Sequence, residues 1–186
     1  MKLTIHNYGD PVLREKAEAI DHVDEKIRTL ARAMVETMHA QAGIGLAAQQ
    51  VGRTIALCVV DLPPEMDTNE EGQPDNPDVV MPMTLVNPVA QDLPNGKWTR
   101  EEGCLSFPEI TGNIERPWSV HVTYMDLDGN PHEQTFHGML ARVVQHEIDH
   151  LNGVLFVDRM SHVKKLALKG RLRRLRQETE EARGQG

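Results

Sequence analysis

Two stretches of the chain repeat apolar residues with the period of an amphipathic helix. In residues 24–41 the apolar positions are Ile27, Leu30, Ala31, Met34, Val35 and Met38. In residues 138–153, GMLARVVQHEIDHLNG, helical spacing connects Met139, Leu140, Val143, Val144, His146, Glu147, His150 and Leu151. Gly138 and the Asn152-Gly153 pair mark the ends of this second helix, and the pair is typical of a left-handed C-terminal cap.

Between these two helices the pattern changes to short runs that are typical of strands. We expect strands over residues 54–61, 81–87, 118–125 and 132–137. The last two are joined by DLDGN, which predicts a hairpin turn. Because the strands follow one another without a helix, the pattern favours an α+β fold. In this fold, antiparallel β-sheets surround the central helix 138–153, with one further helix near each end of the chain.

The C-terminal part of the chain differs from the rest in charge. Residues 163–176, VKKLALKGRLRRLR, predict a basic amphipathic helix that is interrupted at Gly170 and followed by a polar tail. Residues 1–157 carry 11 basic and 24 acidic side chains, a balance of −13. Residues 158–186 carry 9 and 4, a balance of +5. The overall net charge of −8 therefore hides a basic end on an acidic body.

Length and composition favour a single globular domain ahead of that helix. With 39% hydrophobic and 26% charged residues, the 186-residue chain can bury one core. We assign this domain to residues 1–160, and the basic helix with its tail to residues 161–186. Residues 63–78, PPEMDTNEEGQPDNPD, predict a solvated loop. No secretory signal or membrane span is visible, which favours a cytoplasmic protein with no membrane partner and no disulfide.

The helix over residues 138–153 carries the motif His-Glu-Ile-Asp-His. His146 and His150, four positions apart, project from one face of a helix and can bind one metal ion. Glu147 turns toward the same cleft and can act as a general base on a water molecule. Two ordinary surface histidines would have the same spacing, but burying such a group without a metal ion is costly. The apolar context therefore favours a metal site.

A catalytic metal site of this kind needs a third protein ligand and an open position for water. The candidate is Cys104 in the segment Glu-Glu-Gly-Cys-Leu-Ser. Gly103 permits close backbone approach, and the amide of Leu105 can donate a hydrogen bond near the metal. Alternatively, Cys104 packs as a small buried residue or pairs with Cys58, which lies in a strand-like run and is expected in the core.

Residues 43–50, GIGLAAQQ, combine small side chains with two glutamines. The small residues let a substrate or another segment approach the backbone closely. The segment does not match a phosphate-binding loop, because it lacks the Gly-Lys-Ser/Thr sequence. One of the two glutamines can instead direct its amide into a cleft as a donor to an oxyanion.

Taken together, GIGLAAQQ, EGCLS and QHEIDH resemble the three motifs of the peptide deformylase family, in the same order and at similar spacing. The segment YGDPVLR, residues 8–14, is also similar to the N-terminal segment of that family. The resemblance extends from about residue 5 to about residue 160. Three motifs in order make it specific, whereas each motif alone is not.

The resemblance implies a metal-ligand set of Cys104, His146 and His150. It also implies that Glu147 is the catalytic acid/base, and that Gln50 and the Leu105 amide surround the developing oxyanion. Family members usually hold ferrous iron, and nickel, cobalt or zinc can replace it. The residues themselves, one thiolate and two imidazoles, suit all four metals. The implied substrate is the N-formylmethionyl end of nascent polypeptides, and the products are formate and a free amine.

Further residues are expected to line the substrate pocket. Ile44, Met139 and Val143 are the candidates for the pocket of the methionine side chain, with Gly45 and Gly103 at the substrate backbone. The alternative is that the three apolar residues simply belong to the core.

Three positions depart from the pattern of well-known family members. Thr111 stands where many bacterial members carry an arginine near the substrate peptide. Arg100 and Arg142 are charged where some members carry apolar pocket residues. For both arginines we expect the methylene stem to lie on the pocket wall and the guanidinium to lie in water.

Bacterial deformylases that resemble this chain carry a similar C-terminal helix as their ribosome contact. A cationic helix over residues 163–176 suits the phosphates of ribosomal RNA. The alternative is a plain surface helix that docks on its own acidic body.

Two other functions fit the motifs less well. A metalloprotease would take a third ligand after His150, where only His162 and the glutamates of the tail are available. A structural metal site would take four protein ligands, and the chain offers three persuasive ones.

Overall fold

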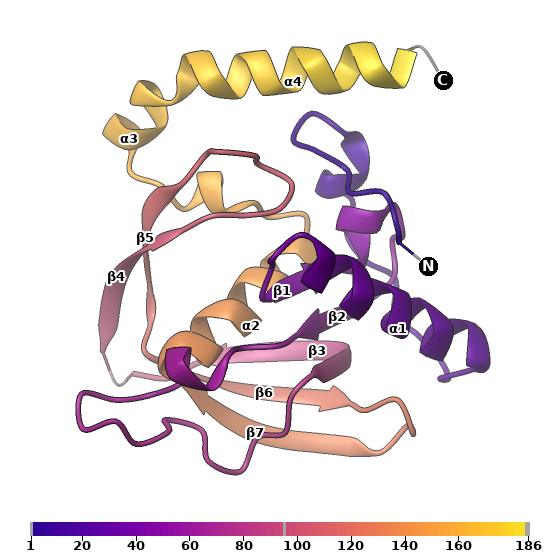
Figure 1. Ribbon diagram of the computed structural model, residues 1–186, viewed down its shortest axis with the longest axis vertical. Helices are drawn as coiled ribbons and strands as arrows, with labels where there is room; N and C mark the ends of the chain where they lie inside the picture. The colour runs from indigo at the N-terminus through magenta and orange to yellow at the C-terminus, as the bar shows by residue number, and fades with distance from the viewer. Residues whose placement is uncertain (1, 95, 185–186) are drawn as a thin grey trace.

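The computed structural model describes residues 2–94 and 96–184, which form two antiparallel sheets with helix α2 between them (Figure 1). The larger sheet has the order β1-β2-β3-β6-β7. Its strands are β1 (Gly45–Ala47), β2 (Leu57–Val60), β3 (Met83–Asp92), β6 (Ser119–Met125) and β7 (Pro131–His137). The smaller sheet pairs β4 (Lys97–Glu102) with β5 (Gly112–Pro117). All strand pairs are antiparallel, as predicted.

The larger sheet is covered on both faces near β2, whose four residues are all buried. Leu57 and Val59 pack in the cluster that includes α1 (Glu25–Ala40). Cys58 and Val60 point to the opposite face, toward α2 (Gly138–Leu151). A strand that is covered on both faces needs apolar side chains on both, which explains the continuous apolar sequence of β2, LCVV.

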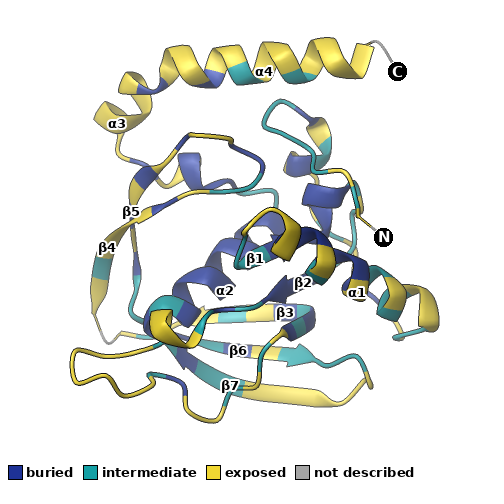
Figure 2. Cartoon of the chain, in the orientation of Figure 1, coloured by how far each residue is buried: buried dark blue, intermediate teal, exposed yellow. Residues whose placement is uncertain are grey.

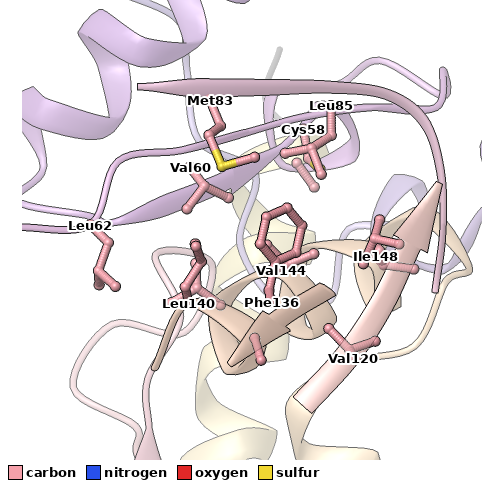
Figure 3. Packing of buried hydrophobic residues seen from close by; sticks show 14 of the residues in the cluster. Cys58, Val60, Leu62, Met83, Leu85, Val120, Phe136, Leu140, Val144 and Ile148 are labelled. Carbon is pink, nitrogen blue, oxygen red and sulfur yellow. The ribbon is translucent and has the colours of Figure 1, made fainter. Parts of the chain in front are cut away.

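Helix α2 lies at the centre of the molecule. Thirteen of its 14 residues are buried (Figure 2). Leu140, Val144 and Ile148 face the larger sheet and pack in one cluster with Val60, Leu85, Val120 and Phe136 (Figure 3). The helix ends as predicted: Gly153 has φ 70°, and a side chain there would meet the backbone of Arg14.

The predicted helices and strands agree with the structure in kind and differ in extent. Helix α1 begins after Asp24, whose side chain accepts a hydrogen bond from the Ile27 amide. The run 54–61 contributes only four residues to β2, whereas β3 continues five residues beyond the predicted end at 87. Strands β1, β4 and β5 were absent from the prediction. β1 has only three residues, and β4 and β5 each contain a single large apolar residue among polar and charged ones, so they lack the apolar alternation by which strands are recognised.

The C-terminal segment also differs from its prediction. The helix break lies at Leu168 instead of Gly170, between α3 (His162–Ala167) and α4 (Lys169–Gly184). The predicted polar tail is helical as far as residue 184. Leu168 and Leu172 are buried in a cluster with Phe107 and Phe156, so α4 docks across the domain through one apolar stripe (Figure 1).

The remaining elements are short 3-10 helices that connect the strands and helices. They are η1 (Pro11–Arg14), η2 (Ala48–Val51), η3 (Pro64–Met66) and η4 (Phe156–Asp158). Residues 63–78 form a largely exposed loop, as predicted, but hydrogen bonds within the loop organise it. None of the helices in the described part of the chain is both long and apolar enough to span a membrane.

Candidate metal centre and active site

Three potential metal ligands converge between α2 and the end of β4. Cys104 lies in the turn after β4, and His146 and His150 lie one turn apart on α2. Their ligand atoms all lie within 4.8 Å of one another, and Cys104 Sγ is 3.3 Å from His150 Nε2. Both cysteines are free thiols, so the alternative of a Cys58–Cys104 disulfide is wrong. Cys58 lies in the core as predicted.

A buried carboxylate orients the first histidine. Glu102 Oε2 lies 3.0 Å from His146 Nδ1, which leaves the other ring nitrogen of His146 available to a metal. Burial by itself raises the pKa of Glu102, but hydrogen bonds from His146 and Arg116 outweigh it and hold the pKa well below its usual range. Glu102 therefore remains a carboxylate and fixes the imidazole ring.

An ionic network connects this carboxylate to the end of α2. Arg116, 1% exposed, donates to Glu102 with Nε and Nη2 and to Asp149 Oδ2 with Nη1. Arg159, which is partly exposed, donates to both oxygens of Asp149. Buried charges are costly unless they are paired and hydrogen-bonded, and each of the four charged groups in this network has a partner. The network joins β4, β5 and α2 around the metal ligands.

The expectation for Arg142 is wrong. Its side chain is buried, and its guanidinium donates to Glu102 Oε1 and to the carbonyl oxygens of Ile114 and Trp98. The guanidinium carbon also lies 4.6 Å from the centre of the Trp98 ring. The head stays out of water because Glu102 compensates its charge. Arg100 is exposed as expected, with its guanidinium 5.0 Å from the same ring.

The second carboxylate of the site differs from Glu102 in its surroundings. Glu147 Oε2 is buried and has no hydrogen-bond partner among the described residues. Burial raises the pKa of Glu147 to about 7, and the charges of His146 and Arg116 oppose this effect only in part. The backbone of Gly45 lies against this carboxylate, since an added Cβ would be 2.3 Å from Glu147 Oε1. Strand β1 can therefore approach only with glycine at this position.

Of the two glutamines in GIGLAAQQ, it is Gln50 that faces the ligands. The Ala47 amide donates to Gln50 Oε1 at 2.8 Å, which turns Nε2 toward Cys104 Sγ at 3.4 Å and Ser106 Oγ at 3.2 Å. The amide group thus presents its donor to the centre of the site. Gln49 is also fully buried, but it does not line the cavity beside the ligands.

A cavity of ≈ 650 Å³ opens beside these groups. All five residues expected at the substrate line it, namely Ile44, Gly45, Gly103, Met139 and Val143. Leu105 and Thr111 are also at its wall, together with Met66 and Arg142. Met66 was not anticipated, because it lies in a loop outside the three motifs.

The sequence reasoning missed the residues that support the ligands. Glu102 and Asp149 lie inside the quoted motifs, and a carboxylate within a buried helix or beside a buried ligand is a signal that a partner must exist. Arg116 has no such signal. Its partners are 14 and 33 residues away, so only the folded chain brings them together.

The donor set fits a catalytic metal ion. One thiolate and two imidazoles suit iron, cobalt, nickel or zinc, and a three-ligand set leaves a position open. Glu147, with an unpartnered buried oxygen, lines the same cavity as Cys104 and His146, and metal-assisted hydrolysis needs such a carboxylate near the metal. The fold and the site together therefore define a metal-dependent hydrolase.

Comparison with known proteins identifies the family. The model of the polypeptide deformylase family matches residues 2–166. The peptide deformylase of Opitutus terrae is 48% identical over 172 residues, which covers 90% of this chain and 90% of that protein. A plant peptide deformylase crystal structure superimposes with a TM-score of 0.85 at 36% identity, over 98% of this chain and 93% of that one. The enzyme from Ehrlichia chaffeensis has a TM-score of 0.82 at 37% identity, with 94% and 96% covered.

The chain belongs to the polypeptide deformylase family. Its activity is that of the family: a metal-dependent hydrolase that removes the N-formyl group from nascent polypeptides. The family resemblance of the three motifs and the α+β fold expected from the strand pattern are thus confirmed.

Proposed function

We propose that Cys104, His146 and His150 bind one Fe²⁺ ion and that Glu147 is the acid/base for removal of the formyl group from formylmethionine. One observation carries this assignment. The three ligand atoms converge within 4.8 Å, and Glu147, whose buried Oε2 has no hydrogen-bond partner among the described residues, lies on the same helix as the two histidines. Ferrous iron is supported by the family resemblance, since the donor set also suits nickel, cobalt and zinc.

The reaction needs a proton to move twice. A divalent ion in this site supplies the positive charge that lowers the pKa of a water molecule and polarises the formyl carbonyl. Glu147 accepts a proton from the water molecule as the water oxygen attacks the formyl carbon. Glu147 then returns the proton to the nitrogen as the carbon–nitrogen bond breaks, because an unprotonated amine is a poor leaving group. The products are formate and the free amino terminus.

Gln50 and the Leu105 amide are assigned to the oxygen of the formyl group. Negative charge grows on this oxygen during the attack, and fixed N–H donors stabilise it more in the transition state than in the ground state. The bond from the Ala47 amide holds the Gln50 side chain in its donating orientation, so little reorganisation is needed.

The substrate backbone is expected to run between β1 and the residues that follow β4. β1 is an edge strand of the larger sheet, and Gly45 and Gly103 both line the cavity. An extended peptide can pair with such an edge through main-chain hydrogen bonds. The methionine side chain would then lie against Ile44, Met139 and Val143.

We assign the basic side chains of α3 and α4 to a ribosome contact, and the enzyme to the cytoplasm. Lys164, Lys165, Lys169, Arg173 and Arg174 are all exposed. They lie on the side of the molecule where α4 crosses the domain. Docking through Leu168 and Leu172 leaves these side chains exposed, and only Lys165 of the five has a carboxylate partner, Asp158 at 3.6 Å, in the described part of the chain. Such exposed cations can contact phosphates, which supports the ribosome contact.

Two measurements on the purified protein test the catalytic assignment. Mass spectrometry of metal content should give one divalent ion per chain. Formyl-Met-Ala-Ser should be hydrolysed with release of formate, and an internal peptide bond should remain uncut. A full complement of metal without formate release, or cleavage inside the peptide, would refute the assignment.

A further inference from the structure

One wall of the cavity beside the metal ligands comes from a segment outside all three motifs. Met66 belongs to the loop over residues 63–78, and it lines the ≈ 650 Å³ cavity together with Met139. The same two methionines line a second hollow of ≈ 780 Å³, which lies between this loop and Trp98 and Trp118. Met66 and Met139 therefore form the partition between the two hollows.

The base of the loop is clamped to the start of α2 by a buried asparagine. Asn76 is 7% exposed and uses both ends of its amide. Nδ2 donates to Asp67 Oδ1 at 2.6 Å and to the His137 carbonyl oxygen at 3.1 Å. Oδ1 accepts from the His137 amide at 2.9 Å. The side chain thereby connects two segments that lie 61 residues apart.

This clamp lies close to both methionines along the chain. Asp67 directly follows Met66, and His137 precedes Met139 by two positions. Because Asn76 holds both Asp67 and His137, it sets the distance between the loop wall and the helix wall of the cavity. Figure 1 shows the short helix η3, which ends at Met66, beside the N-terminal end of α2.

We propose that the loop over residues 63–78 is part of the substrate site, with Met66 as a specificity-determining residue and Asn76 as the residue that positions it. The proposal rests on the function assigned above and adds the outer wall of the methionine pocket. Met66 is 39% exposed, so a substrate methionine can cover apolar surface there. A thioether side chain is flexible and polarisable, which suits contact with another methionine.

Substrates with and without the long side chain separate this role from a general loss of activity. Met66→Ala is compared with the wild type on formyl-Met-Ala-Ser and formyl-Ala-Ala-Ser. For the methionyl peptide we expect KM to rise about 10-fold, the lower end of the range for lost apolar contact in a pocket, with kcat nearly unchanged. The alanyl peptide cannot reach Met66, so its kcat/KM should change by roughly twofold at most.

Two further variants serve as controls for Met66→Ala. Met66→Leu keeps the apolar volume and should retain most of the preference for methionine. Gln73→Ala changes an exposed residue of the same loop that lines neither hollow, and both substrates should behave as in the wild type. Equal losses for both peptides in Met66→Ala, or no loss for either, would overturn the proposal.

The positioning role of Asn76 is tested by a double-mutant cycle. If Asn76 acts through Met66, Asn76→Ala should lower the preference for the methionyl peptide, with little further change in the Met66→Ala background. Asp67→Asn, which keeps the shape of the side chain, is measured in parallel in case Asn76→Ala does not fold. A merely structural role would lower the unfolding midpoint and leave the ratio of the two substrates unchanged.

These outcomes differ from a failure of the catalytic assignment. If wild-type protein released no formate from either peptide, the proposed function would fall. If wild-type activity is present and only the ratio of substrates fails to respond to Met66 and Asn76, the loop proposal alone is wrong.

Discussion

Helices α2 and α4 present polar residues in opposite surroundings. Thirteen of the 14 residues of α2 are buried, whereas Leu172 is the single buried residue among the 16 of α4. In α2, Arg142, Gln145, His146 and Asp149 each have hydrogen-bond partners within the protein. In α4, most charged side chains lie in water (Figure 2).

Charged and polar residues thus have different roles according to how far their side chains are buried. A buried charge must be matched by partners, so its removal disturbs both the fold and the site. An exposed charge contributes little to stability and is available to another molecule. Substitutions of the buried polar residues of α2 should therefore affect chemistry and folding, and substitutions of exposed charges such as Arg173 and Arg174 in α4 should affect only association.

The largest effect is expected at Glu147. Glu147→Gln removes the group that accepts and returns the proton, and kcat for formate release should fall by about 10²–10⁴-fold. Metal content and the unfolding midpoint should stay close to those of the wild type, because the amide has nearly the same shape. Glu180→Gln, on the exposed surface of α4, is the matched control. Turnover near the wild-type rate in Glu147→Gln would remove its assignment as acid/base.

The buried network should respond next. Arg116→Leu leaves Glu102 and Asp149 with fewer partners, and we expect the free energy of unfolding to fall by about 3 kcal/mol. Urea denaturation followed by circular dichroism measures this change. Arg173→Leu in α4 should change the same quantity by about 0.5 kcal/mol or less. Similar losses for the two arginines would contradict the contrast between the two helices.

Cys104 tests the metal site itself. In Cys104→Ser the hydroxyl is a poorer ligand than a thiolate, so metal affinity should fall. Mutating a residue that only hydrogen-bonds to a metal ligand typically lowers metal affinity by roughly 10–100-fold, and loss of a ligand itself should lower it further. Metal content after dialysis and formate release should both decrease. Cys58→Ala changes the buried cysteine of β2, which is not among the proposed ligands, and this variant should keep its metal. If serine retains metal and activity in full, the third ligand is another residue.

The smallest effect on the enzyme itself is expected in α4. Arg173→Glu combined with Arg174→Glu should leave hydrolysis of short formyl peptides unchanged and stability within about 0.5 kcal/mol. Co-sedimentation with ribosomes should decrease, and binding by the wild type should weaken steeply with salt. Charge reversal is preferable to truncation, because Leu168 and Leu172 are buried against Phe107. If the variant pellets with ribosomes as well as the wild type does, the contact lies elsewhere.

Much of the proposed site could be predicted from the sequence. The spacing of His146 and His150 on an apolar helix predicts a shared metal, since residues four apart on a helix share a face. Cys104 is the candidate ligand in the segment EGCLS, and the family resemblance selects Gln50 from the two glutamines of GIGLAAQQ. The structure places Cys104 beside the two histidines and Gln50 beside Cys104. The inference from histidine spacing depends on local geometry, which is encoded within a few residues of sequence.

The partners of those residues were decided by the tertiary structure. The sequence predicts that the guanidinium of Arg142 lies in water. In the structure it is buried and bonded to Glu102 and Trp98, about 40 residues earlier in the chain. Arg116 and Asn76 likewise act through partners far away in sequence. A single sequence shows hydrophobic period and motif spacing, but the energy of a buried polar group depends on which distant group folding places beside it. For this protein, the sequence alone predicted Cys104, His146 and His150 as metal ligands, and only the folded chain showed which side chains surround them.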